Sequence, residues 1–238
     1  MPNRLDIAVI SPEDSPWRQL ELRFLIDGDD VLEQVFDAGP GADPDRLLGP
    51  DGLLPAAEGA TMVRLAEAVC SWGCCGCINV RIHREGDQIV WDQWHNPDAD
   101  GVPLGEFRFD VAQYEAELLR ARQDRAWEWP GRAIARLTEA LLVARPEVLG
   151  RWNSGLDFVG SLPGKRGEVE VVFTSPPREV IHEHWEQYGR PLEHTQYKLR
   201  FPVTVEPAEI QAERIVTTLR TGDPRANAET CGGYTEQE

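Results

Sequence analysis

Residues 78–94 read INVRIHREGDQIVWDQW, two runs rich in β-branched and aromatic residues on either side of the turn sequence Arg84-Glu85-Gly86-Asp87. Runs of this kind, separated by Gly and Asp, are typical of a β-hairpin. Phe107 to Phe109 predicts a third short strand, and Asp110 is a favourable N-cap for a helix. The apolar face of that helix would consist of Tyr114, Leu118 and Ala121.

A similar order of elements is expected further along the chain. Residues 168–173 and 179–185 have strand-like composition, 197–205 is extended, and 207–221 has the pattern of a helix. A shift of 91 residues superposes the apolar positions of the two hairpins. We therefore expect two related ββ–β–α units, 77–121 and 168–221, although shared periodicity alone could produce the same match.

The remaining patterns favour one α+β domain over residues 1–223. Leu5–Ile10 and Leu20–Ile26 alternate as half-buried strands do, and Pro130 begins a helix that Pro146 stops. Residues 224–238 are polar and acidic, and we expect a disordered tail there. The predicted fold is therefore α+β, with antiparallel β-hairpins packed against about three helices.

Charge and composition limit the classes of function. The 238 residues include 41 Asp+Glu against 24 Lys+Arg, a net charge of −17, and 41% are hydrophobic. No run of about 18 apolar residues exists, and the N-terminus lacks the pattern of a signal peptide. Five cysteines without that signal favour a reduced, cytoplasmic protein. The negative charge argues against nucleic acid or a membrane surface as partner and favours a basic protein.

The acidic charge is densest between residues 27 and 51, which hold eight acidic residues and one Arg. An exposed loop of this kind could imitate an anionic substrate and steer a basic partner into contact. We therefore expect a non-enzymatic, acidic binding protein of the inhibitor or toxin-neutralising (immunity-like) type. Its candidate partner-binding residues are Asp27, Asp29, Asp30, Asp43 and Asp45.

The alternative function rests on a cysteine cluster, CSWGCCGC at residues 70–77. Cys70, Cys74 and Cys77 could bind Zn²⁺, since a short turn with glycines lets thiolates converge on one metal ion. The protein would then be metal-binding or thiol-dependent. The other interpretation is a set of small buried cysteines at the start of a strand. The spacing also matches the C-x-x-x-C-x-x-C of radical SAM enzymes, but a β-hairpin follows it here instead of a helix.

Other catalytic patterns are incomplete. His182 and His184, two residues apart on an expected strand, would share one face and could chelate a metal or transfer protons; a plain polar strand face is the alternative. Residues 160–166 resemble a phosphate-binding loop but are one residue short, and Arg166 replaces the Ser or Thr that would bind Mg²⁺. The chain therefore offers no complete catalytic set by sequence.

The hairpin of residues 78–94, with Trp91 and Trp94, and the junction Trp127-Glu128-Trp129-Pro130 resemble uncharacterised proteins of high-GC bacteria. Only two lysines against 22 arginines fit such a source. The resemblance covers roughly residues 20 to 145 and implies no catalytic residue and no function.

Overall fold

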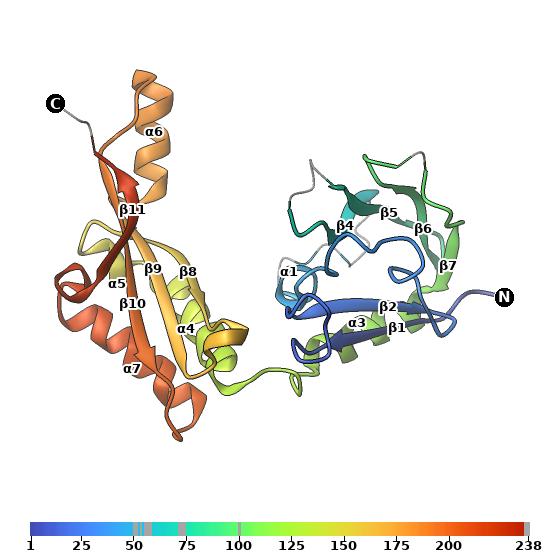
Figure 1. Ribbon diagram of the computed structural model, residues 1–238, viewed down its shortest axis with the longest axis horizontal. Helices are drawn as coiled ribbons and strands as arrows, with labels where there is room; N and C mark the ends of the chain where they lie inside the picture. Colours follow the sequence, from blue (N-terminus) through green and yellow to red (C-terminus); the bar gives the residue numbers. More distant parts are fainter. Residues whose placement is uncertain (50–51, 53, 55–58, 71–74, 100, 236–238) are drawn as a thin grey trace. The chain divides into compact units, whose positions relative to one another are not determined.

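The computed structural model describes residues 1–49, 52, 54, 59–70, 75–99 and 101–235 (Figure 1). The chain divides into two compact units, Met1–Trp127 and Glu128–Glu238. Each unit has its own cluster of buried apolar side chains. The sequence patterns predicted a single domain over residues 1–223, whereas the described chain builds two cores.

Unit 1 contains two antiparallel sheets, with strand orders β1-β2-β3 and β4-β5-β6-β7. Its described elements are β1 (Leu5–Ile10), β2 (Glu21–Ile26), β3 (Asp29–Asp30), α1 (Pro44–Leu48), β4 (Thr61–Glu67), β5 (Cys77–Glu85), β6 (Gln88–His95), β7 (Phe107–Asp110) and α3 (Val111–Gln123). The hairpin predicted over residues 78–94 is present, with Glu85 opposite Gln88 across its turn.

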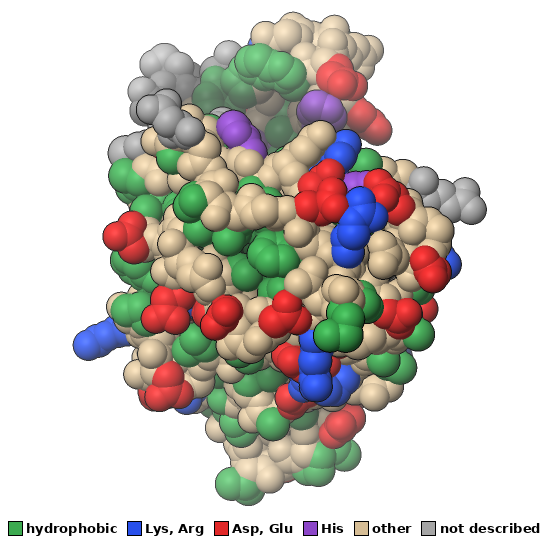
Figure 2. Space-filling view, turned by 90° about the vertical axis from the view of Figure 1, so that its right-hand side faces the viewer, with side chains coloured by type: hydrophobic (Ala, Val, Ile, Leu, Met, Phe, Trp, Pro, Cys, Tyr) green, Lys and Arg blue, Asp and Glu red, His purple; other side chains and the backbone are tan. Residues whose placement is uncertain are grey.

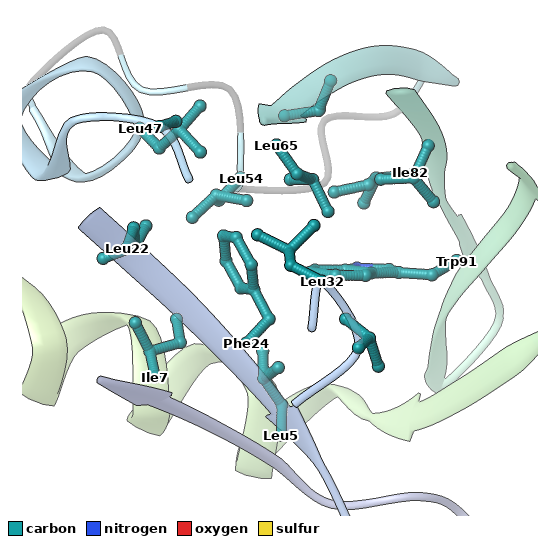
Figure 3. Close-up of a cluster of buried hydrophobic side chains, with 14 of the residues drawn as sticks. Leu5, Ile7, Leu22, Phe24, Leu32, Leu47, Leu54, Leu65, Ile82 and Trp91 are labelled. Atoms are coloured by element: carbon teal, nitrogen blue, oxygen red, sulfur yellow. The ribbon is translucent and has the colours of Figure 1, made fainter. Parts of the chain in front are cut away.

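The core of unit 1 lies between its two sheets (Figure 3). Phe24 and Leu22 of β2 point toward Leu65 of β4 and Trp91 of β6. Trp91 is fully buried, and its ring meets the rings of its neighbours edge to face. Pairs of this geometry stabilise a core beyond their buried area. The two sheets are therefore fastened by aromatic packing.

Helix α3 begins where the sequence predicted. Asp110 caps it by accepting a hydrogen bond from the backbone N–H of Gln113 at 3.0 Å. Side chains of α3 also form hydrogen bonds with the backbone of β1. Gln113 Nε2 donates to the Leu5 carbonyl, and Glu117 Oε1 accepts from the Ile7 N–H at 2.6 Å. Because β1 is an edge strand, α3 covers backbone groups that β2 leaves unpaired.

Unit 2 is one antiparallel sheet of order β11-β10-β9-β8, with α4 and α7 packed on one face. Its elements are α4 (Pro130–Ala144), α5 (Glu147–Gly150), β8 (Gly155–Gly160), η1 (Pro163–Lys165), β9 (Glu168–Ser175), α6 (Arg178–Tyr188), β10 (His194–Pro202), α7 (Ala208–Thr221), η2 (Pro224–Asn227) and β11 (Glu229–Tyr234). The α+β class is thus confirmed, with antiparallel sheets and six α-helices in the described parts of the chain.

The expected repeat of units 77–121 and 168–221 is wrong, because residues 178–188 form helix α6 instead of a strand. The second segment therefore runs strand–helix–strand–helix, whereas the first runs strand–strand–strand–helix. The apolar residues Ile181, Trp185 and Tyr188 recur at helical spacing. Gly189, with φ +63°, ends the helix in the left-handed conformation that glycine adopts most readily.

The disordered tail expected over residues 224–238 is also wrong as far as the structure describes it. Residues 224–227 form a short 3-10 turn, and β11 pairs with β10 from His194 opposite Tyr234 to Lys198 opposite Glu229. All side chains of β11 are exposed. Its polar composition looks like a tail because β11 is held by backbone pairing and by surface contacts such as Glu229 with Arg200, and it buries no side chain.

Candidate functional site

The five carboxylates predicted to bind a partner lie in unit 1, at two separate places. Asp27, Asp29 and Asp30 follow the end of β2, at its turn into β3. Asp43 is the N-cap of α1 and Asp45 lies in its first turn, next to the start of β2, where the Ala42 carbonyl accepts from the Leu22 N–H at 2.8 Å. A six-residue strand separates the two places by about 17–20 Å.

Asp27 is exposed but rigidly held. Its carboxylate accepts hydrogen bonds from Asn3 Nδ2 at 2.7 Å and from the Arg4 backbone N–H at 2.8 Å. These two bonds, that from Asn3 first, lower the pKa of the Asp27 carboxyl below its ordinary value. Asp27 therefore keeps its negative charge in one fixed position.

The other predicted carboxylates have structural tasks. Asp30 Oδ1 accepts from the Leu32 N–H at 2.9 Å, and Oδ2 lies 3.6 Å from Arg23 Nη1. Asp43 caps α1, and Asp45 lies 3.3 Å from Arg125 Nη1. Nearby cations thus offset the charges of Asp30 and Asp45.

The structure adds Glu33 and Asp37 to the candidate surface. They belong to residues 27–37, here called the acidic segment, which contain five acidic residues and no basic one. Val31 and Leu32 of the acidic segment are buried in the core of unit 1, with exposed fractions of 2% and 1%. Asp29, Glu33 and Asp37 are exposed. No cation of the described chain pairs with these three carboxylates within 4 Å.

The charge of the chain is unevenly divided. Residues 1–127 hold 24 acidic and 11 basic side chains, a net charge of −13, whereas residues 128–238 hold 17 and 13, a net charge of −4. Figure 2 shows acidic side chains spread over one face of the molecule, with fewer Lys and Arg side chains between them. Unit 1 therefore carries most of the field that a basic partner would meet.

The cysteine cluster lies in the connection between β4 and β5. Cys70 is exposed, and Cys77 is buried at the start of β5, where its sulfur accepts a hydrogen bond from Asn79 Nδ2 at 3.1 Å. Cys74 lies outside the described residues. Within the described part of the chain, no three His, Cys, Asp or Glu side chains are grouped as a metal site requires. Zinc binding by Cys70, Cys74 and Cys77 stays a prediction.

A site that the sequence did not predict lies in unit 2, on the sheet face opposite α4 and α7. Thr174 of β9 stands directly across from Gln196 of β10, so their side chains share one face, while Phe173 and Tyr197 share the other. A cavity of about 580 Å³ opens between this face and helix α6. It is lined by Thr174, Arg178, Ile181, His182, Trp185, Pro191, His194, Gln196 and Gly233.

Asp157 of β8 organises the polar side of this cavity. Its side chain is 4% exposed and accepts hydrogen bonds from Arg178 Nε, from Thr174 Oγ1, and from Gln196 Nε2 at 2.8 Å. Burial alone would raise the pKa of the Asp157 carboxyl, but the three hydrogen bonds outweigh it and the pKa lies below its ordinary value. An ionised Asp157 thus holds three cavity side chains in place.

The expectation that His182 and His184 share a face is wrong, because both lie on helix α6. Side chains two positions apart in a helix point in directions that differ by about 200°. His182 lines the cavity, with Nε2 3.2 Å from Glu186. His184 instead donates from Nδ1 to the Arg190 carbonyl at 3.1 Å and packs on Tyr188. His182 therefore lines the cavity together with Arg178 and His194, and not together with His184.

Comparison with known proteins gave no match: no protein-family model, no curated protein and no solved structure is similar to this chain. No helix in the described ranges is long and apolar enough to cross a lipid bilayer.

Proposed function

We propose that the chain is a binding protein of the inhibitor or toxin-neutralising type, whose acidic segment, residues 27–37, docks on a basic polypeptide. The observation that carries the proposal is a group of exposed carboxylates, at Asp27, Asp29, Glu33 and Asp37, in a segment whose Val31 and Leu32 are buried in the core of unit 1. Asp43 and Asp45 lie outside this segment and contribute to the general field.

An anchored backbone makes such a group useful for recognition. A partner that meets a segment already ordered by Val31, Leu32 and the Asp27 hydrogen bonds does not have to offset the entropy of fixing that backbone. An exposed carboxylate paired with a cation contributes a net of about 0–1 kcal/mol, so several such pairs are needed for a stable contact. The field of unit 1 would in addition speed the encounter at low ionic strength.

The test compares two variants of equal charge. The first carries Asp29→Asn, Glu33→Gln and Asp37→Asn in the acidic segment. The control carries Asp87→Asn, Asp98→Asn and Glu115→Gln at exposed positions elsewhere in unit 1. Both have a net charge of −14, and Asp27 is kept because it fastens the turn.

A partner is first captured from the native source on the immobilised wild-type chain at low salt. Association rates are then measured for the three proteins. We expect the acidic-segment variant to associate about tenfold more slowly than the control variant, with the difference shrinking as salt rises. Equal rates for the two variants, or failure to capture any basic polypeptide, would contradict the proposal.

A further inference from the structure

A cavity large enough for a small molecule lies between helix α6 and the sheet of unit 2. None of the 11 residues of α6 is buried, although Ile181 and Trp185 line the cavity that separates α6 from the sheet. The volume of about 580 Å³ lies in the range of small-molecule sites, which is about 300–1,000 Å³. The cavity combines one apolar wall, formed by Ile181, Trp185 and Pro191, with a group of polar side chains on the other side.

Arg178 is oriented for an anion. Its Nε donates to Asp157, which is itself held by Thr174 and Gln196. No residue of the described chain accepts a hydrogen bond from the two Nη groups of Arg178. A guanidinium fixed through Nε presents its Nη groups as a planar pair of donors, the geometry that suits a carboxylate.

The surrounding charges limit the anion to a single negative charge. Arg178 is the one permanent cation among the described lining residues, its Nε is paired with Asp157, and the charge of Glu179 also acts on it. Glu186, beside His182, adds another negative charge at the rim. Among these negative charges each further negative charge on the ligand adds repulsion, so a carboxylate is favoured over a doubly charged phosphate.

His194 adds a polar group whose orientation is set. Its Nδ1 donates to the Leu192 carbonyl at 2.8 Å, and its ring stacks on Tyr234. The tautomer fixed by this bond leaves Nε2 as an acceptor on the neutral ring. The polar side of the cavity can therefore accept a hydrogen bond as well as donate one.

We infer that this cavity binds a monoanionic carboxylate attached to an apolar or aromatic group, with the carboxylate on Arg178 and the apolar group against Trp185. Two sources share this chemistry: a free small carboxylic acid, and the C-terminus of a polypeptide that ends in an apolar residue. The inference concerns unit 2 alone and does not depend on the acidic segment of unit 1.

Four probes test the inference by calorimetric titration of the full chain: 3-phenylpropanoate, 3-phenylpropanamide, the peptide acetyl-Ala-Ala-Ser-Leu with a free carboxylate, and the same peptide as C-terminal amide. We expect at least one acid to bind, and its amide to bind at least tenfold more weakly. The tighter of the two acids identifies the source. An amide that binds as well as its acid, or no binding of either acid at millimolar concentration, overturns the inference.

The matched variants are Arg178→Gln, which removes the anchor, and Arg190→Gln, which removes the same charge from an exposed position outside the cavity. Arg178→Gln should weaken binding at least tenfold and Arg190→Gln should not change it. Trp185→Ala removes part of the apolar wall and keeps the Asp157–Arg178 pair. It should therefore weaken binding of the acid although the anchor for the carboxylate remains. Equal affinity of wild type and Arg178→Gln, or of wild type and Trp185→Ala, would overturn the proposed geometry.

Discussion

Replacement of Trp91 by alanine should remove the largest fully buried side chain of the described residues, which packs against Phe24 of the other sheet of unit 1. The Trp91 ring is 0% exposed and lies 5.4 Å from the ring centroid of Phe24 and 5.6 Å from that of Phe109. Its Nε1 donates to the Tyr114 hydroxyl at 3.3 Å, and that hydroxyl donates to the Leu54 carbonyl at 2.8 Å. The substitution therefore empties the centre of the core and removes one buried hydrogen bond.

The expected loss follows from these contacts. Truncation of a buried Trp to Ala costs about 3–5 kcal/mol, because apolar area is lost and the cavity closes only in part. The Tyr114 hydroxyl keeps its bond to Leu54, so no buried donor is left without a partner. Urea unfolding followed by circular dichroism would measure the change in the free energy of unfolding.

A surface tryptophan supplies the control. Trp185 is 54% exposed, so Trp185→Ala should change the free energy of unfolding by less than about 1 kcal/mol. A loss below about 1 kcal/mol for Trp91→Ala would refute the placement of Trp91 at the centre of the unit 1 core.

Three further predictions concern the rest of the chain. Because the folded-state pKa of Asp157 lies below its ordinary value of 3.8, its ionised form stabilises the fold above about pH 4, and this contribution is lost as pH falls through the folded-state pKa. Asp157→Asn should thus lower the melting temperature at pH 7 and lower it less near pH 3; an equal effect at both pH values would contradict this. If Cys70–Cys77 holds zinc, purified protein should contain about one equivalent and a chelator should lower its melting temperature, whereas metal-free protein with an unchanged melting temperature would exclude zinc. Gly189→Ala should destabilise α6 by about 1 kcal/mol, seen as faster amide exchange in that helix, while Gly222→Ala, at φ −137°, should not, and the reverse order would count against the assigned helix end.

Local patterns were sufficient where one short-range signal decided the structure. The alternation from Leu20 to Ile26 predicted the buried apolar side chains of β2, although it did not predict the burial of Glu21, and Asp110 predicted the start of α3. Pro130 likewise marked the start of α4. In each case hydrophobic periodicity and a capping or turn residue agree with each other.

Local sequence patterns failed where a segment fits both the strand and the helix periodicity, and where pairing with a distant strand determines the structure. Residues 178–188 fit both an alternating and a helical pattern, and the helix formed with Gly189 as its end. Strand β11 is held by backbone pairing to β10, which side-chain composition does not reveal.

The two candidate sites also differ in how far the sequence could predict them. The acidic segment is contiguous in sequence, so most of its carboxylates could be predicted, although the offset of Asp30 by Arg23 could not. The cavity of unit 2 brings together Asp157, Arg178 and Gln196 from two strands and a helix. No spacing in the sequence indicates such a group, because its members meet only through the register of the sheet.

We propose that residues 27–37 form the contact surface for a basic partner. The most direct test is a titration of the isotope-labelled chain with the captured partner, followed through backbone amide chemical shifts at low and at high salt. The proposal predicts the largest shifts at Asp29, Glu33 and Asp37, and their reduction at high salt. Shifts confined to other residues, or a response at residues 27–37 that salt does not change, would contradict it.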